Sequence, residues 1–456
     1  MPEIENPYKF RGPLDPMNKK IPCVDKKDDV ERVIRGIKNG DYWAIVGPRQ
    51  IGKTTFLNLV KKEISENTHD YYIYFDFDMV PKSEKEFYQW LIDQFLANIP
   101  RRIKGGRIKY KTIKSESPEI SFFNFLKNFR PKDDKKRIIL IFDEIDKHPF
   151  LTSFLLLWRK VYHERPGKES EVEKRQLSRY AVITSGAVEI IKAITGPTSP
   201  FNVAQDLHLR DFSEEESEEL IQKPLTELNI NLKEEAKKEL LSQISGHPQL
   251  LQHACYLLVE TARESSKSEI TKNDVDNTIK RLYKENSSLK TLKKNIKEHN
   301  ELKKLLENIL IEKNQIKFHP NIEFELLGVG AIKEDRETSY CKIRNPIYEK
   351  FIMDILNNPV EEPDLKSKEK LKEEHEKEEK NAQISTVSIQ SQAESPPGKR
   401  KKFGKILVYI FGGSAIVLIA LSIWFQNSEL MFGGGISAAL ALGLLTVLPG
   451  EEKRKT

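Results

Sequence analysis

The stretch Tyr42-Trp-Ala-Ile-Val-Gly47-Pro-Arg-Gln-Ile-Gly52-Lys53-Thr54 decides the fold. Its last eight residues match the pattern G-x-x-x-x-G-K-[ST] of a phosphate-binding loop in full. The apolar run before Gly47 is typical of a buried strand, and a helical pattern starts at Lys53 with Phe56 and Val60 on its apolar face. The order strand, loop, helix is the context that this pattern requires, and it predicts a nucleotide site.

Each position of the loop suits this chemistry. The glycines allow the backbone N–H groups to point inward at phosphate, and the start of the following helix adds positive potential. Lys53 can bridge the β- and γ-phosphates as a catalytic cation, and the Thr54 hydroxyl can ligate Mg²⁺. The predicted nucleotide-binding residues of the loop are Gly47, Pro48, Arg49, Gln50, Ile51, Gly52, Lys53, Thr54 and Thr55. The alternative is a glycine turn that only joins a strand to a helix.

A second apolar run, Ile138-Ile-Leu-Ile-Phe-Asp143-Glu144, ends in two acids. Open α/β sheets bind ligands at the carboxyl ends of their strands, so both acids are expected beside the phosphates. Asp143 is the predicted metal residue with Thr54, and Glu144 is the predicted general base that activates water. The alternative is that these acids cap the next helix, a role also expected for Asp146 and His148 unless they lie on the surface.

A third strand, Tyr180 to Thr184, ends in Thr184 and Ser185, which are candidate sensors of the γ-phosphate. Polar residues that simply close a strand are an equally weighted alternative.

The alternation of strands and helices predicts an α/β P-loop NTPase core, a doubly wound and mostly parallel sheet, over residues 1–205. Strands are expected at Tyr42–Val46, Tyr71–Phe77, Ile138–Phe142 and Tyr180–Thr184. Helices are expected at Lys27–Lys38, from Lys53, and at Glu84–Ala97, Phe150–Tyr162 and Ala187–Ile194. A helical lid over residues 206–289 and a winged-helix-like module over residues 290–357, with a hairpin at Gly330–Ile343, follow.

The composition excludes several classes of protein. The 456 residues include 75 Lys+Arg and 69 Asp+Glu, so the net charge of +6 does not by itself argue for nucleic-acid binding. Three distant cysteines exclude a disulfide framework. Residues 101–114 form a basic stretch, expected to be a solvated loop rather than a lipid or nucleic-acid contact. Residues 358–405 are charged and poor in aliphatic side chains, which predicts a disordered linker.

The end of the chain carries a predicted transmembrane helical hairpin, residues 406–448. Its two charge-free segments, 406–425 and 430–448, each reach the thickness of a bilayer core as helices. Basic residues flank both, so the ATPase part and the basic tail 449–456 are expected in the cytoplasm and the protein in the membrane with two spans. The hairpin is expected to be an anchor before a pore, and a buried hairpin in a soluble protein is the weaker alternative.

Several segments together resemble the AAA-like ATPases of the STAND branch, the signal-transduction ATPases with numerous domains. They are the loop from Arg49 to Leu57, the strand end from Ile141 to Asp146, and the segments Ser199–Asn202, Leu207–Ser213, Gly246–Leu251 and Ile343–Tyr348. The resemblance covers roughly residues 7–355, and its Gly-His-Pro and Arg-Asn-Pro segments favour this branch.

The resemblance implies ATP and Mg²⁺ as cofactors and an ATP-dependent switch. In that branch the proline of a Gly-x-Pro motif in the lid contacts the base, which points to Gly246, His247 and Pro248. From the residues alone, this segment is a turn between two helices. The chain departs from the branch because it has no repeat array, and only Arg179 and Arg210 are candidates for an arginine finger.

The predicted function is therefore a membrane-anchored switch that binds and hydrolyses ATP, self-associates, and acts in signalling or defence, with a protein partner as a further possibility. The alternative is a membrane-tethered, DNA-associated ATPase that uses its winged-helix module, and nucleic acid is the less favoured partner. A membrane scaffold with a vestigial site is the third hypothesis, against which the intact Lys53, Thr54, Asp143 and Glu144 argue.

Overall fold

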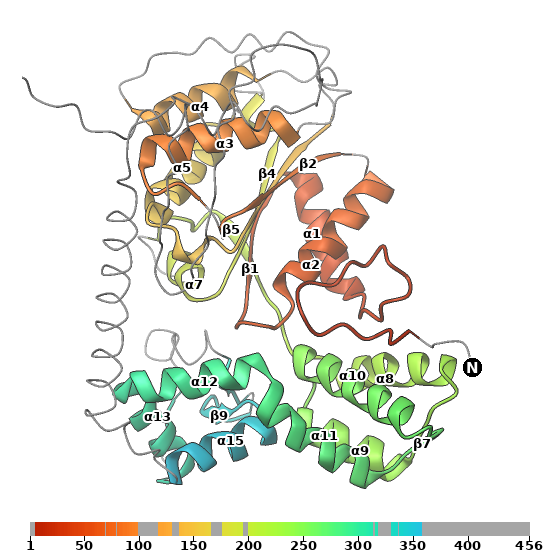
Figure 1. Ribbon diagram of the computed structural model, residues 1–456. Coiled ribbons are helices and arrows are strands. Elements are labelled where there is room, and N and C mark those ends of the chain that lie inside the picture. Colours follow the sequence, from red (N-terminus) through yellow and green to blue (C-terminus); the bar gives the residue numbers. More distant parts are fainter. Residues whose placement is uncertain are drawn as a thin grey trace, which may run out of the picture. The chain divides into compact units, whose positions relative to one another are not determined.

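The computed structural model describes residues 5–357 except 69, 79, 99–116, 130–135, 166–175, 195–198, 313–314, 318–329 and 336. The described residues all lie in the first of two compact units, Met1–Val360 (Figure 1). The predicted linker, transmembrane hairpin and basic tail, and the whole basic stretch 101–114, lie outside the described residues. Within the described ranges no helix is both long and apolar enough to cross a membrane.

A five-stranded parallel sheet in the order β2-β3-β4-β1-β5 forms the centre of the core. Its strands are β1 (Tyr42–Val46), β2 (Tyr71–Asp76), β3 (Ile138–Asp143), β4 (Tyr180–Gly186) and β5 (Ala204–His208). The first four were predicted from their apolar runs. The sequence did not predict β5, because this edge strand buries only Leu207 and so lacks an apolar run.

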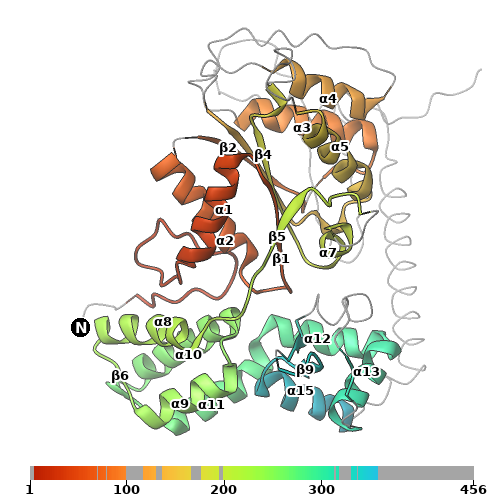
Figure 2. The same ribbon diagram turned by 180° about the vertical axis from the view of Figure 1, so that it is seen from behind.

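Helices cover both faces of the sheet, as predicted for a doubly wound core (Figures 1 and 2). One face carries α1 (Lys27–Asn39) and α2 (Lys53–Glu63). The other carries α3 (Glu84–Asn98), α4 (Pro118–Asn128), α5 (Leu151–His163) and α7 (Val188–Ile194). Because side chains alternate along a strand, Ile139 and Ile141 of β3 face α1 and α2, whereas Leu140 and Phe142 face the other layer.

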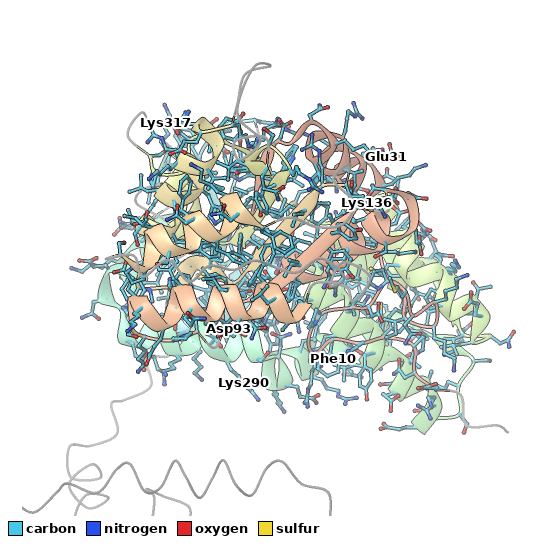
Figure 3. All side chains as sticks on the ribbon, turned by 90° about the horizontal axis from the view of Figure 1, so that it is seen from above. Phe10, Glu31, Asp93, Lys136, Lys290 and Lys317 are labelled. Atoms are coloured by element: carbon cyan, nitrogen blue, oxygen red, sulfur yellow. The ribbon has the colours of Figure 1, made fainter. Side chains whose placement is uncertain are left out.

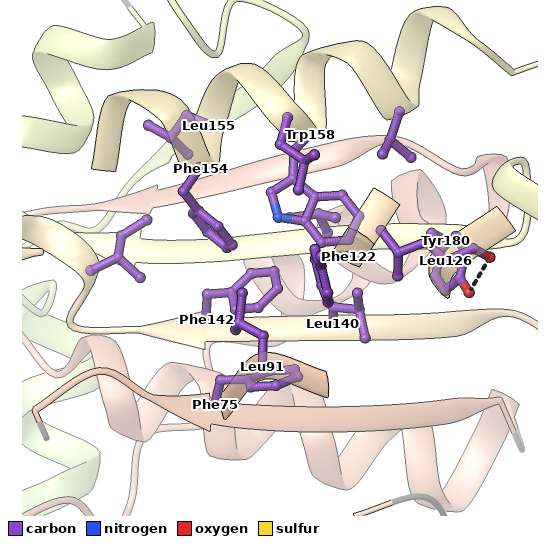
Figure 4. Close-up of a cluster of buried hydrophobic side chains, with 14 of the residues drawn as sticks. Phe75, Leu91, Phe122, Leu126, Leu140, Phe142, Phe154, Leu155, Trp158 and Tyr180 are labelled. Carbon is purple, nitrogen blue, oxygen red and sulfur yellow. Dashed lines mark hydrogen bonds between the residues drawn. The ribbon is translucent and has the colours of Figure 1, made fainter. Parts of the chain in front are cut away.

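The layer on the second face is rich in aromatic side chains (Figure 4). Phe142 packs edge-on against Phe154 at a centroid distance of 4.9 Å, and Trp158 lies next to both. The Tyr180 hydroxyl, fully buried at the start of β4, donates a 3.0 Å hydrogen bond to the Leu126 carbonyl of α4. This packing fixes β3 and β4, whose carboxyl ends carry the predicted acids and sensors.

A helical lid follows the core, as predicted, and contains four helices: α8 (Glu214–Glu227), α9 (Glu234–Ile244), α10 (Pro248–Glu264) and α11 (Lys272–Glu285). A short parallel pair, β6 (Asn231–Leu232) with β7 (Glu269–Ile270), ties its two halves together. Ser213 and Glu216 form a capping box at the start of α8. Gly246 turns the chain between α9 and α10 with φ 74°, and a Cβ there would lie 2.2 Å from the Phe212 carbonyl oxygen.

The part of the chain after the lid, residues 287–357, contains three helices and a strand pair in its described residues. They are α12 (Ser287–Glu298), α13 (Asn300–Leu310), the antiparallel pair β8 (Ile332–Glu334) and β9 (Cys341–Ile343), and α15 (Pro346–Asn357). The strand pair lies in the predicted hairpin region. Buried side chains of this part and of the lid form one continuous cluster that includes Leu258, Leu289 and Ile347. Side chains fill the space between the ribbons (Figure 3). The classification of this part as a winged-helix module stays a prediction.

Candidate nucleotide-binding site

The phosphate loop, residues 47–54, joins β1 to α2 at the carboxyl edge of the sheet. Gln50 (φ 63°) and Gly52 (φ 95°) adopt the left-handed conformation, which turns successive backbone N–H groups toward one side. Gly52 caps α2 without a side-chain hydrogen bond, so the first N–H groups of this helix are left to a bound anion. The loop therefore has the backbone of an anion cradle.

Lys53 lies folded into this loop and is only 6% exposed. Its Nζ donates to the carbonyl oxygens of Gly47 (3.1 Å) and Pro48 (3.2 Å). Burial lowers the pKa of the ammonium, and the charge of Glu144 acts in the opposite direction. A phosphate oxygen would offer this partly desolvated cation a stronger partner than two neutral carbonyls.

Asp143 faces the loop, as the sequence predicts. Its Oδ2 atom accepts hydrogen bonds from the Thr54 hydroxyl and from the Tyr74 hydroxyl, both at 2.8 Å. Burial, followed by the charge of Asp143, raises the pKa of Tyr74, so this phenol is a neutral donor. Tyr74 was not singled out from the sequence. The Tyr74 hydroxyl reaches Asp143 because β2 lies beside β3 in the parallel sheet.

Glu144 follows Asp143 in the left-handed conformation with φ 56°. This conformation is uncommon for a residue with a side chain and is often found at functional sites. The side chain lines the cavity described below, where partial burial raises the pKa of its carboxyl and the charge of Lys53 lowers it. A carboxyl whose pKa is moved upward is better suited to accept a proton.

The donor set fits Mg²⁺. Mg²⁺ prefers oxygen ligands and is usually held by one or two protein oxygens together with substrate phosphates. Thr54 Oγ1 and Asp143 Oδ2 already touch each other beside the loop. No cluster of three or more His, Cys, Asp or Glu side chains occurs among the described residues, so a metal held wholly by such protein groups is not found there.

The two candidate sensors differ in their surroundings. The Thr184 hydroxyl donates to the Trp43 carbonyl at 3.2 Å, which ties it to the neighbouring strand. Ser185 points to the opposite face, the one that carries α2, and its buried hydroxyl has no partner among the described atoms. The Ser185 hydroxyl is therefore available to contact a γ-phosphate. Thr184 instead fits the alternative interpretation, a polar residue that closes a strand.

A cavity of about 390 Å³ opens beside the loop. Its walls come from the phosphate loop and α2, the N-terminal segment, Glu144, and the lid. The lining residues are Lys9–Leu14, Cys23, Val24, Lys26, Gln50–Phe56, Leu59, Glu144, Leu209, Phe212, Pro248, Gln249, Gln252 and Ser287. Pro248, the lid residue that the family resemblance implies, is thus on the wall, whereas Gly47, Pro48 and Arg49 are not.

The N-terminal segment, residues 5–14, contacts both the lid and α2. The Tyr8 hydroxyl donates to the carbonyls of Leu220 and Ile221 in the lid, both at 3.1 Å. The Phe10 ring stacks on the ring of His253 with centroids 3.8 Å apart. At its other end, the Leu14 N–H donates to Thr55 Oγ1. The segment thereby joins lid to phosphate loop. In the sequence, the aromatic residues before the first helix are the feature that could have indicated this contact.

His247 is the N-cap residue of α10 and directly follows the turn at Gly246. Its Nδ1 accepts from the Leu250 N–H at 3.4 Å, which assigns the ring proton to Nε2, 3.3 Å from the Tyr348 hydroxyl of α15. The ring is completely buried, and this burial, followed by the charge of Arg344, moves its pKa well below the usual value. His247 is therefore neutral in the folded protein.

This burial predicts a pH dependence of stability. As pH falls below about 6.5, the unfolded chain takes up a proton at His247 that the folded chain cannot, so the free energy of unfolding decreases by up to about 1.4 kcal/mol per pH unit. Urea unfolding between pH 7.5 and 5.5 measures this. In His247→Asn, which keeps an acceptor for Leu250, the decrease should be smaller. Equal slopes in His247→Asn and wild type would contradict the assignment.

The part of the chain after the lid, residues 287–357, contacts the phosphate loop, which the sequence did not predict. The Ser288 hydroxyl donates to Gln50 Oε1. A Cβ on Gly330 would lie 3.3 Å from Pro48 and 2.7 Å from Arg344 Nη1. The residues in the first of these contacts are 238 apart in the chain, and contacts over such separations leave no local pattern in a sequence.

The two candidate arginine fingers and the two candidate capping residues each bind other groups of the protein. Arg179 donates to the Lys136 carbonyl at the amino end of the sheet, opposite the loop, and Arg210 pairs with Glu216 at 2.6 Å. Asp146 accepts from the N–H groups of Ala187 and Ile190 at the start of α7, the capping role expected for it. His148 is buried against Phe87, where it accepts from the Phe150 N–H, so it is a capping residue and not a surface residue.

A parallel sheet with a phosphate loop after its first strand, and an acidic residue of another strand bonded to the loop threonine, defines a P-loop NTPase. Residues 24–354 match the family of the AAA-like domain, and the chain belongs to that family. This membership implies the binding and hydrolysis of ATP with Mg²⁺. Among curated proteins none matches the chain.

Three solved structures illustrate the likeness. A Walker-type ATPase of Pyrococcus abyssi has 16% identity and a TM-score of 0.50, over 75% of this chain and 99% of its own. The Cdc6 protein of Pyrobaculum aerophilum has 12% identity and a TM-score of 0.41, over 77% and 98%. The ORC2 protein of Aeropyrum pernix, solved with ADPNP and ADP, has 11% identity and a TM-score of 0.43, over 77% and 98%. The likeness to the first of these structures supports the fold and nothing beyond it.

Proposed function

We propose that the protein is a membrane-anchored, ATP-dependent switch of the STAND type. One observation carries the nucleotide part of this proposal: residues of the phosphate loop and of lid helix α10 line the same cavity. A nucleotide that fills it contacts core and lid together. The bound nucleotide therefore favours the arrangement of core and lid to which it binds more tightly. The size of this shift is the difference in its binding free energy between the two arrangements.

The roles of the residues follow from their positions. The backbone of the loop and Lys53 hold the phosphates, and Pro248 contacts the base. Glu144 accepts a proton from the attacking water, and the Ser185 hydroxyl senses the γ-phosphate. Mg²⁺, held by Thr54 and Asp143, would neutralise charge on the phosphates.

The output of the switch rests on the sequence. The apolar segments 406–425 and 430–448 with their basic flanks support membrane anchoring, and the charged linker before them supports a tethered ATPase part with a cytoplasmic location. Self-association in response to ATP, with signalling or defence as the result, is the role that this combination favours. Small residues at Gly435, Ala439 and Gly443 would allow close helix packing between copies.

The nucleotide part is tested by titrating the full-length protein with ATP and Mg²⁺. Lys53→Ala removes a charged donor to the phosphates, and we expect its affinity for ATP to fall about tenfold to hundredfold. The matched control is Lys38→Ala at an exposed position of α1, which should bind as wild type. Failure of the wild-type protein to bind ATP, or equal affinity in Lys53→Ala, would contradict the proposed site.

A second candidate is the DNA-associated ATPase. The specific observation is the row of exposed lysines on α12, namely Lys290 (Figure 3), Lys293, Lys294 and Lys297. Such a row can neutralise phosphates, and the affinity for DNA would then decrease steeply with salt. The absence of DNA binding at low salt would remove this candidate, while the ATP switch would stand.

A further inference from the structure

The part of the cavity wall that the lid and its neighbouring segments supply carries apolar side chains. These apolar side chains include Phe212, Val24 and Pro248. Sites of this kind hold a ligand mainly by apolar contact, and a few polar groups decide which ligand fits. The polar side chains in this part of the wall therefore bear on which base is bound.

Most of these polar groups already have partners within the protein. Gln249 donates to the Phe10 carbonyl at 3.5 Å and accepts from Asn286 Nδ2 at 2.9 Å. Lys26 pairs with Glu216 at 3.2 Å, and the Cys23 thiol donates to the neighbouring Val24 carbonyl. Each of these side chains is therefore already bound to another group of the protein.

Gln252, one turn further along α10, differs. Its side chain lines the cavity and is 5% exposed. Its Nε2 donates to the Pro22 carbonyl at 2.8 Å, while its Oε1 is buried with no partner among the described atoms. The amide cannot be reversed without placing Oε1 against the Pro22 carbonyl, so the bond to Pro22 determines that the group left over is an acceptor.

A buried acceptor without a donor is costly, and a ligand that brings an N–H group removes that cost. Adenine carries an amino group at C6, whereas guanine and hypoxanthine carry a carbonyl oxygen there. We propose that Gln252 Oε1 accepts a hydrogen bond from this amino group and selects adenine over 6-oxopurine nucleotides. The proposal rests on the proposed function, because it takes the cavity to be the nucleotide site.

The size of the effect follows from the exchange of a donor for an acceptor. A 6-oxopurine would set its carbonyl oxygen against Gln252 Oε1 and leave both acceptors unpaired and dehydrated. We therefore expect the wild-type protein to bind ATP about tenfold to hundredfold more tightly than inosine triphosphate. An ATP analogue with two methyl groups on the C6 nitrogen has no N–H there and should bind as weakly as inosine triphosphate.

The experiment is a competition titration on the full-length protein, with ATP, inosine triphosphate and the dimethylated analogue each displacing a fluorescent ATP. In Gln252→Leu, which keeps the size of the side chain, the preference for ATP over inosine triphosphate should disappear. Gln243→Leu, on lid helix α9 and outside the cavity lining, is the matched control and should keep the preference.

The outcomes separate the two proposals. If the wild-type protein binds none of the triphosphates, the proposed function fails and the role of Gln252 fails with it. If it binds all three equally, or if folded Gln252→Leu retains the wild-type ratio, the selective role of Gln252 is overturned while the nucleotide site stands. The three ligands on the wild-type protein provide a test even if Gln252→Leu does not fold.

Discussion

Glu144→Gln is expected to hydrolyse ATP about 10²- to 10⁴-fold more slowly than the wild-type protein and to keep its affinity for ATP. Glutamine has the shape of glutamate but cannot accept a proton at neutral pH. The side chain lines the cavity next to Lys53, and partial burial raises the pKa of its carboxyl, which suits a group that takes a proton from water. Phosphate release in single turnover measures the loss.

Binding should survive because the phosphates are held by other groups. The loop backbone, Lys53 and the Thr54–Asp143 pair are unchanged in the variant, and the loss of a negative charge near the phosphates removes a repulsion. The variant should therefore remain in its ATP-bound form. If the switch self-associates with ATP, particle sizing should show the larger species persisting in Glu144→Gln and decaying in the wild-type protein.

The matched control is Glu86→Gln, an exposed carboxylate on α3 in the helix layer across the sheet from α2. It makes the same chemical change away from the cavity and should leave the rate unchanged. Hydrolysis by Glu144→Gln at the wild-type rate would remove Glu144 from the general-base role and leave nucleotide binding untouched.

The parts of the site that the sequence predicts correctly are those held by local pattern. A phosphate loop between a strand and a helix, and an acid at the end of an apolar strand, are each encoded within a few residues. Because carboxyl ends of parallel strands meet at one edge, Asp143 could be expected opposite Thr54, and the 2.8 Å hydrogen bond between them agrees.

The parts that the sequence does not predict depend on contacts between distant segments. Phe10 reaches the cavity because Tyr8 and Asn6 bind lid carbonyls more than 200 residues away. Gln252 is one of several glutamines on lid helices, and only the Pro22 carbonyl distinguishes it. The edge strand β5 is hidden for another reason, since its mostly exposed side chains give no apolar run.

Arg344→Met is expected to lower the free energy of unfolding by about 3–5 kcal/mol. Arg344, just after β9, is 2% exposed and donates to Asp211 through Nε (3.1 Å) and Nη2 (2.5 Å). Burial alone would raise the pKa of Asp211, but the charge and hydrogen bonds of Arg344 bring it below its usual value. Methionine retains most of the apolar stem and leaves this carboxylate dehydrated and unpaired.

The matched control is Lys342→Met, two residues earlier. Lys342 pairs with Asp335 at 2.6 Å, but 46% of its side chain is exposed. Because water solvates both partners when an exposed pair is broken, this change should cost no more than about 1 kcal/mol. Urea unfolding of the two variants compares a buried pair with an exposed pair in the same hairpin.

The position of the buried pair gives the loss a functional meaning. Asp211 lies between β5 and α8, where the core passes into the lid, and Arg344 comes from the part of the chain that also contacts Pro48 and Gln50 of the phosphate loop. Adding Asp211→Asn to Arg344→Met removes the unpaired charge and should restore part of the stability. If Arg344→Met is no less stable than Lys342→Met, or if the double variant recovers nothing, an uncompensated Asp211 is not the cause, and the pair does not hold these three parts together.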